Sequence, residues 1–176
     1  WESSREAVAQ LIVDLDCDLI AMQEVTIPCR DDLKKLVRKA GGRYGLWWIN
    51  TYPEDHKTPV GNAVFYKKKD FSFDQQRILY FSPTPEVMSK GWDEVKYYRA
   101  ALTSVVTHKK SGKKFFFIAT HGPLGKEASA QAGRILVEID REYNVEGLPS
   151  IVVGDMNASP DKPFYLTACE YFDDAF

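Results

Sequence analysis

Cysteine is scarce in this sequence, and the few that occur are not spaced for a metal site or a disulfide framework. The 176 residues contain only Cys17, Cys29 and Cys169, an odd total with no CxxC pair. Structural zinc sites and small disulfide scaffolds both need paired or clustered cysteines. We therefore expect reduced, packed thiols rather than a cysteine-built centre.

Long apolar runs are also missing. No stretch approaches the roughly 20 apolar residues that are needed to cross a bilayer, so we expect a soluble domain without integral membrane association. The first residue is Trp1 rather than methionine, which leaves a removed signal peptide, and therefore secretion, open. The compartment is not fixed by the sequence.

The chain lacks a broad excess of positive charge. Its formal net charge is −2 at pH 7, unlike the strongly basic domains that bind nucleic acid nonspecifically. Lysines nevertheless gather at 67–69 and at 109–114, beside expected strand ends. Two interpretations stay open: these lysines protect strand edges from pairing, or they form a local anion-binding cluster.

The composition present is that of a folded domain. Apolar residues make up 44% of the chain and aromatic residues 13%, which argues against disorder. The length fits one domain with a substantial core, and no repeat or linker interrupts it. We therefore predict a single domain over residues 1–176.

Apolar periodicity predicts alternating helices and strands. Four helices are expected. The first is marked by apolar residues at helical spacing, Val8, Leu11, Ile12 and Leu15, and the second by Leu33, Leu36, Val37 and Ala40, ending at Gly41-Gly42. The other two are expected over 127–143 and 163–170. Strands are expected at 18–25, 44–49, 61–67, 71–81, 97–108, 113–121 and 150–155, with loops at 51–59 and 82–93. Adjacent antiparallel strands with covering helices predict an α/β (α+β) fold: a four-layer α/β sandwich of two packed mixed or antiparallel sheets flanked by helices.

Three of the predicted strands end in polar groups. Glu24 closes the first strand, His121 closes the strand at 113–121, and Asp155 with Asn157 follows the apolar run 151–153. Ligands of α/β proteins collect at strand ends, and carboxylate and amide oxygens suit a hard divalent cation. Each group alone is also compatible with ordinary capping or turn chemistry.

The loop at 82–93 carries two further candidates. Lys90 and Trp92 could line a substrate mouth, because long loops in compact domains are often functional. The alternative is that Trp92 packs the loop onto the sheet.

Several motifs together resemble the endonuclease/exonuclease/phosphatase superfamily, the metal-dependent phosphoesterases that include deoxyribonuclease I. They are Trp1 and Arg5, DLIAMQEV at 18–25, GNAVFYKK at 61–68, FSPTPEVMSKGWD at 81–93, Arg99, ATH at 119–121 and VVGDMNASP at 152–160. The SPTPEVMSKGWD segment resembles a bacterial branch. The resemblance covers essentially the whole chain and implies a deoxyribonuclease I-like fold.

The resemblance also implies roles for individual residues. Glu24 would bind the metal, Mg²⁺ or alternatively Mn²⁺, and His121 would contact or polarise the scissile phosphate. Asp155 and Asn157 would act at the phosphate and the attacking water, and Arg99 would contact the substrate anion. Asn62 is a weaker candidate. Which of the two carboxylates is the base and which the ligand stays open.

The chain departs from the family pattern in three places. It opens after the family's first strand, which carries a metal-proximal Asn, and it stops before the closing Asp-His segment. Gly122 follows the TH pair where the family commonly has Leu. We therefore expect a fragment, and a chain truncated in this way would lack activity.

Two functions remain in competition. The first is a monomeric metal-dependent hydrolase of phosphate esters, a phosphodiesterase, nuclease or phosphatase acting on nucleic acid, a lipid headgroup or a sugar phosphate. The alternative is a non-catalytic binding or scaffold domain that retains the fold but not the activity. Fold alone does not choose among the substrates.

Overall fold

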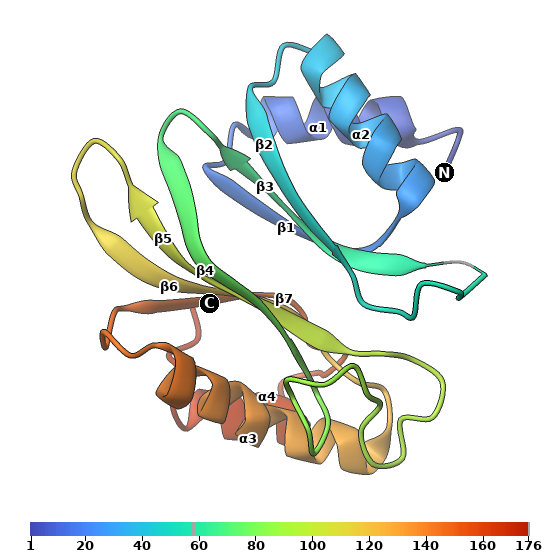
Figure 1. The fold of residues 1–176 in the computed structure, drawn as a ribbon, viewed down its shortest axis with the longest axis vertical. Coiled ribbons are helices and arrows are strands. Elements are labelled where there is room, and N and C mark those ends of the chain that lie inside the picture. The colour runs from blue at the N-terminus through green and yellow to red at the C-terminus, as the bar shows by residue number, and fades with distance from the viewer. Residues whose placement is uncertain (58, 176) are drawn as a thin grey trace. The chain divides into compact units, whose positions relative to one another are not determined.

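A computed structural model describes residues 1–57 and 59–175. The contacts between Cα atoms divide it into two compact units (Figure 1). Unit 1 holds residues 1–72 and 107–113, and unit 2 holds residues 73–106 together with the chain from residue 114 onward.

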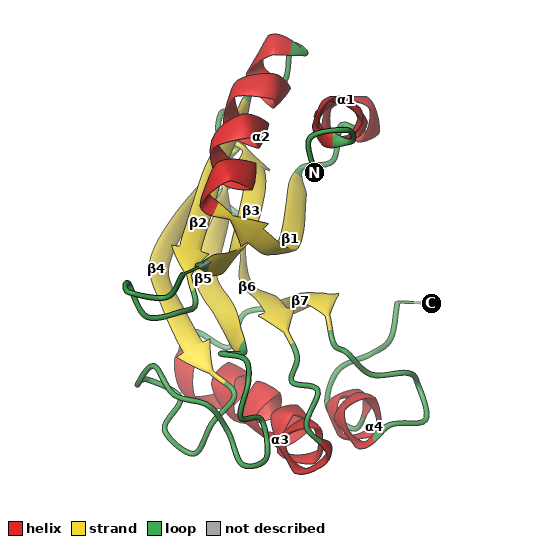
Figure 2. Cartoon of the chain, turned by 90° about the vertical axis from the view of Figure 1, so that its right-hand side faces the viewer, coloured by secondary structure: helices red, strands yellow, loops and turns green. Residues whose placement is uncertain are grey.

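Unit 1 is a three-stranded antiparallel sheet with two helices. Its elements are α1 (Arg5–Leu15), β1 (Leu19–Thr26), α2 (Ile27–Lys39), β2 (Tyr44–Asn50) and β3 (Val60–Lys67). The strand order is β1-β3-β2, with β3 antiparallel to both neighbours. Both helices cover one face of this sheet (Figure 2), where Ile12, Leu33 and Val37 pack with Phe65.

The first helix buries only part of its apolar stripe. Ala9 and Ile12 are buried, whereas Leu11 is 55% and Leu15 58% exposed. The helix predicted from this spacing is confirmed as Arg5–Leu15, and its buried residues are Ala9 and Ile12.

Unit 2 is built on a four-stranded sheet of order β4-β5-β6-β7. Its elements are β4 (Phe71–Tyr80), β5 (Ala100–His108), β6 (Lys114–His121), α3 (Lys126–Tyr143), β7 (Ser150–Asp155) and α4 (Pro163–Cys169). The apolar face of α3 packs on this sheet through Ile135, Leu136 and Ile139, and Phe164 of α4 joins the same core. The first two residues of β4 and the last two of β5 fall in unit 1.

The predicted fold class is confirmed: the chain forms two mixed or antiparallel sheets flanked by helices. The strand expected from Tyr97 begins only at Ala100, because residues 94–97 are held by side-chain contacts to the loop. The loop expected at 51–59 is observed apart from residue 58, which lies outside the described residues. None of the described helices is long and apolar enough to cross a membrane.

Candidate functional site

Two neighbouring strands of unit 2 bring His121 and Asp155 to the same edge. β6 and β7 run parallel, and their register pairs these two residues directly. The backbone N–H of Gly122 donates to the Asp155 carbonyl at 2.7 Å and continues the pairing past the strand ends. As a result, the His121 Nε2 and Asp155 Oδ2 atoms lie 3.9 Å apart.

Two glycines allow this close approach. Gly154 has a φ of +139°, and a Cβ there would lie 2.1 Å from the Thr120 carbonyl oxygen. A Cβ on Gly122 would lie 2.2 Å from the Met156 carbonyl oxygen. Any larger residue would force the backbones apart. The unusual Gly122 therefore has a packing reason in this chain.

Asn157 fixes the turn that follows Asp155. Its backbone N–H donates to Asp155 Oδ1 at 2.8 Å, and its side-chain Nδ2 donates to the Gly122 carbonyl at 2.8 Å. Its φ of +50° lies in the left-handed region, which asparagine tolerates better than most residues. The side chain of Asp155 remains 53% exposed, so one carboxylate oxygen faces solvent.

A buried arginine contacts the histidine ring. Arg99 is 5% and His121 6% exposed. Arg99 Nη1 lies 2.8 Å from His121 Nδ1 and also contacts Nε2, and the Tyr97 ring lies under the guanidinium at 4.6 Å. A guanidinium only donates hydrogen bonds, so only one of the two ring nitrogens can accept from Arg99, and that nitrogen carries no proton.

The environment of His121 makes the ring neutral. Burial and, to a smaller extent, the charge of Arg99 lower its pKa, Asp155 raises it, and the balance takes the pKa from 6.5 to about 4. Desolvation disfavours the charged form of histidine. At pH 7 the positive charge in this pair of side chains therefore resides on Arg99 and not on His121.

Glu24 belongs to unit 1. It lies on β1 where the pairing with β3 shifts register between Met22 and Val25, and its φ is +57°. Such a conformation is uncommon outside glycine and often marks functional positions. Its side chain is exposed, whereas Asn62 on β3 is buried. That Glu24 binds a metal ion stays a prediction.

The side-chain oxygen atoms of Asp155 and Asn157 are of the kind that bind a hard cation. Asp155 offers a carboxylate oxygen, and Asn157, whose amide nitrogen is engaged with Gly122, offers its amide oxygen. Mg²⁺ is commonly held by one or two carboxylates with waters and substrate completing the shell. Within residues 1–57 and 59–175, no three His, Cys, Asp or Glu side chains are grouped so as to hold a metal by themselves.

Sequence reasoning missed two acidic residues that position this edge. Glu94 is 5% exposed; its Oε2 accepts from the Leu124 N–H at 2.9 Å and its Oε1 from the Tyr97 N–H at 3.2 Å. Asp93 accepts from the first N–H groups of α3, those of Glu127 and Ala128. A capping residue normally adjoins its helix, and this one lies in a distant loop.

The loop at 82–93 is tied down by its own side chains. Trp92 packs against the core of unit 2, which confirms the packing interpretation. Lys90 Nζ donates to the Val95 carbonyl at 2.8 Å and lies over the Tyr98 ring. Lys90 therefore stabilises the loop.

Comparisons with known proteins identify the family of the chain. The chain matches the Endonuclease/Exonuclease/phosphatase family over residues 1–175. It is 23% identical to the CCR4-Not complex 3'-5'-exoribonuclease subunit Ccr4 of Candida albicans, over 94% of this chain and 24% of that protein. Thus it spans about a quarter of the length of the curated relatives.

Solved bacterial structures share the fold. An endonuclease/exonuclease/phosphatase family protein from Bacteroides thetaiotaomicron is 25% identical with a TM-score of 0.86, over 97% of this chain and 59% of that one. A mannosyl-6-phosphatase from the same organism is 24% identical with a TM-score of 0.85, over 97% and 62%. The chain belongs to the endonuclease/exonuclease/phosphatase family.

Proposed function

We propose that this chain is part of a metal-dependent hydrolase of phosphate esters. The observation that supports the proposal most strongly is the parallel pairing of β6 and β7, which sets His121 beside Asp155, with Arg99 and Asn157 in contact with them. A fixed cation and a neutral ring donor can stabilise the charge that develops in phosphoryl hydrolysis, and an exposed carboxylate can act as its general base. Family membership supports the same reaction class.

Glu24 would hold the divalent cation, Mg²⁺ or Mn²⁺, with Asp155 as the other candidate ligand. When bound, the cation supplies Lewis-acid stabilisation of the charge on the phosphate oxygens. The positive φ of Glu24 supports this role, because such uncommon backbone conformations cluster at functional sites.

Asp155 would act on the attacking water. Its carboxylate is half-exposed, and the backbone N–H of Asn157 fixes its orientation. The carboxylate would accept a proton as the water oxygen bonds to phosphorus, while the bond from phosphorus to the leaving oxygen breaks. A general base of this kind contributes about 10²–10⁴-fold to the rate.

Arg99 and His121 would stabilise the developing negative charge. Because the His121 ring is neutral at pH 7, its one N–H would serve as a hydrogen-bond donor, and Arg99 would supply the charge. Loss of one such donor from a preorganised site costs about 10²–10³-fold in rate.

Relatives suggest which substrates to test first. The matched Candida albicans protein is a 3'-5'-exoribonuclease subunit and the Bacteroides protein a mannosyl-6-phosphatase. An RNA phosphodiester and a sugar phosphomonoester are therefore the leading substrates for this chain, and lipid headgroups come third.

The test measures hydrolysis of an oligoribonucleotide and of mannose 6-phosphate by the full-length protein that contains this chain, with Mg²⁺ or Mn²⁺ and then with EDTA. Glu24→Gln and Asp155→Asn should each lower turnover by at least about 10²-fold. Asp173→Asn removes the same charge at an exposed position and should leave turnover unchanged. Equal turnover in all three variants would refute the assigned residues.

Calorimetric titration with Mn²⁺ provides a second readout that does not need turnover. Binding by the unmodified chain that weakens in Glu24→Gln supports the proposal. A chain that neither hydrolyses these esters nor binds Mn²⁺ would instead be a non-catalytic binding domain.

A further inference from the structure

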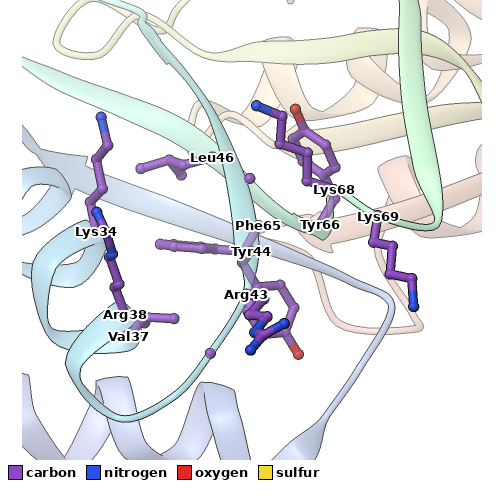
Figure 3. A pocket seen from close by; sticks show the side chains of 12 residues that line it. Lys34, Val37, Arg38, Arg43, Tyr44, Leu46, Phe65, Tyr66, Lys68 and Lys69 are labelled. Atoms are coloured by element: carbon purple, nitrogen blue, oxygen red, sulfur yellow. The ribbon is translucent and has the colours of Figure 1, made fainter.

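A basic pocket lies within unit 1, around its outer strand β2 (Figure 3). Its volume is about 680 Å³. Five basic side chains line it: Lys34, Arg38, Arg43, Lys68 and Lys69. None of the described lining residues is acidic, although the whole chain carries a net charge of −2.

Helix α2 and the turn after it supply three of the five cations. Lys34 and Arg38 lie four residues apart and share one face of the helix. Gly41, with a φ of +94°, and Gly42, whose N–H donates to the Val37 carbonyl at 2.9 Å, reverse the chain. The reversal brings Arg43 to the start of β2 on the same pocket wall.

The turn between β3 and β4 supplies the other two. Lys68 and Lys69 are exposed in this turn, and Lys109 Nζ donates to the Lys68 carbonyl at 2.7 Å. Figure 3 shows Lys34 and Arg38 on one side of β2 and Lys68 and Lys69 on the other. The cations therefore come from separate segments that the fold assembles around one cavity.

The pocket cations form no ion pairs within residues 1–57 and 59–175. Elsewhere in unit 1, Arg30 pairs with Asp31 at 2.8 Å and Lys67 with Asp16 at 3.1 Å. By contrast, none of the five pocket cations forms an ion pair with any described residue. Their charge is available to an external anion.

Ordinary structural roles account for only some of the five basic side chains that line the pocket. Lysines beside a strand edge discourage unwanted pairing, which could explain Lys68 and Lys69. A cation in the last turn of a helix interacts with its dipole, which could explain Arg38. Lys34, one turn earlier, also interacts through its charge with Asp31, three residues before it. None of these roles explains why all five basic side chains line one pocket.

We infer that this pocket binds a phosphate-bearing ligand of nucleotide size: a nucleotide unit, either free or within a single-stranded nucleic acid. Its volume lies in the range of small-ligand sites, about 300–1,000 Å³. Arginine and lysine are the side chains that bind phosphate oxygens. The half-buried Tyr44 and Tyr66 in the lining offer aromatic surface to a base. The inference does not depend on hydrolysis.

The test is fluorescence anisotropy of the purified chain with a labelled oligouridylate of about ten nucleotides, in EDTA so that no turnover occurs. The pocket variant combines Lys34→Gln, Arg38→Gln and Lys68→Gln, all at exposed positions. The matched control combines Lys35→Gln, Lys39→Gln and Lys110→Gln, which remove the same charge outside the pocket. Both are checked for unchanged thermal melting.

The pocket variant should bind at least about tenfold more weakly, and its salt dependence between about 50 and 200 mM should become shallower. The charge-matched control should bind within about twofold of the unmodified chain. Equal weakening in both variants, or no binding by the unmodified chain, would overturn the inference. Competition distinguishes the source: displacement by uridine monophosphate indicates a free nucleotide, and displacement only by unlabelled oligomer indicates a strand.

Discussion

The His121 ring and the Asp155 carboxylate lie 3.9 Å apart at the ends of two parallel strands, yet the ring is uncharged. A neighbouring carboxylate raises the pKa of histidine, but burial and Arg99 outweigh it here and leave the pKa at about 4. This edge of unit 2 therefore combines one permanent cation, Arg99, with one carboxylate at neutral pH.

The first prediction concerns stability against pH. Unfolded histidine takes up a proton near pH 6.5, whereas folded His121 does so only near 4. Between these values the unfolded state binds more protons, so the free energy of unfolding falls as pH drops through this window. The loss reaches up to about 3 kcal/mol at the lower end.

Urea unfolding in EDTA at pH 7 and at about pH 4.5 measures this loss. The control is His121→Gln, which cannot titrate. The difference in unfolding free energy between the two pH values should be smaller in the variant. If the two proteins lose stability equally, His121 is not the group responsible.

The second prediction concerns the origin of the low pKa. Arg99→Gln removes the charge that contacts the ring, so the pKa of His121 should rise while remaining below its ordinary value because of burial. NMR titration of the imidazole resonances measures it. Arg77→Gln, whose guanidinium lies over the Tyr143 ring instead, is the matched control. An unchanged titration midpoint in Arg99→Gln would leave burial as the sole cause.

Strand ends were predictable because their signals are local. The apolar runs that end in His121 and in Asp155 predict two strands without any knowledge of the strands they pair with. In the structure, β6 and β7 end at these residues. The intervening helix α3 makes a parallel crossover the natural connection. The position of His121 and Asp155 at one edge of the sheet was therefore predictable from two local apolar runs and from the rule that strands joined by a helix pair in parallel.

Long-range contacts were not predictable from the same patterns. Glu94 accepts a hydrogen bond from the N–H of Leu124, which follows β6 and lies 30 residues away. No pattern near Glu94 in the sequence predicts this contact. The pairing of Arg99 with the ring of His121 also spans distant segments. The positive φ of Glu24 depends on a register shift against β3, which no periodicity encodes.

The third prediction uses two glycines that both have positive φ. In Gly154→Ala, the new Cβ would lie 2.1 Å from the Thr120 carbonyl oxygen, whereas in Gly112→Ala it would have nothing within 4 Å. Gly112→Ala should therefore cost about 1 kcal/mol of unfolding free energy from backbone strain alone. Gly154→Ala should cost about 3 kcal/mol or more, because β6 and β7 must separate. Similar losses in urea unfolding would contradict the close approach.

The fourth prediction concerns the carboxylate that holds the loop after β6. Both oxygens of the buried Glu94 accept backbone N–H groups, those of Leu124 and Tyr97. An amide at this position can accept on one side only and presents a second donor on the other. Glu94→Gln should therefore cost about 1–3 kcal/mol, the penalty of a buried unsatisfied donor.

Glu86→Gln makes the same chemical change in the same loop and serves as the control. Its Oε1 accepts from the Tyr143 hydroxyl at 2.8 Å at an exposed position, a bond that the amide oxygen can retain, so its unfolding free energy should change by less than about 0.5 kcal/mol. Hydrogen exchange adds a local readout, because the Leu124 amide should lose protection in Glu94→Gln and keep it in Glu86→Gln. Full protection of Leu124 in both variants would mean that Glu94 does not hold this loop, and the position of His121 would then rest on the pairing of β6 with β5 and β7 and on the contact with Arg99.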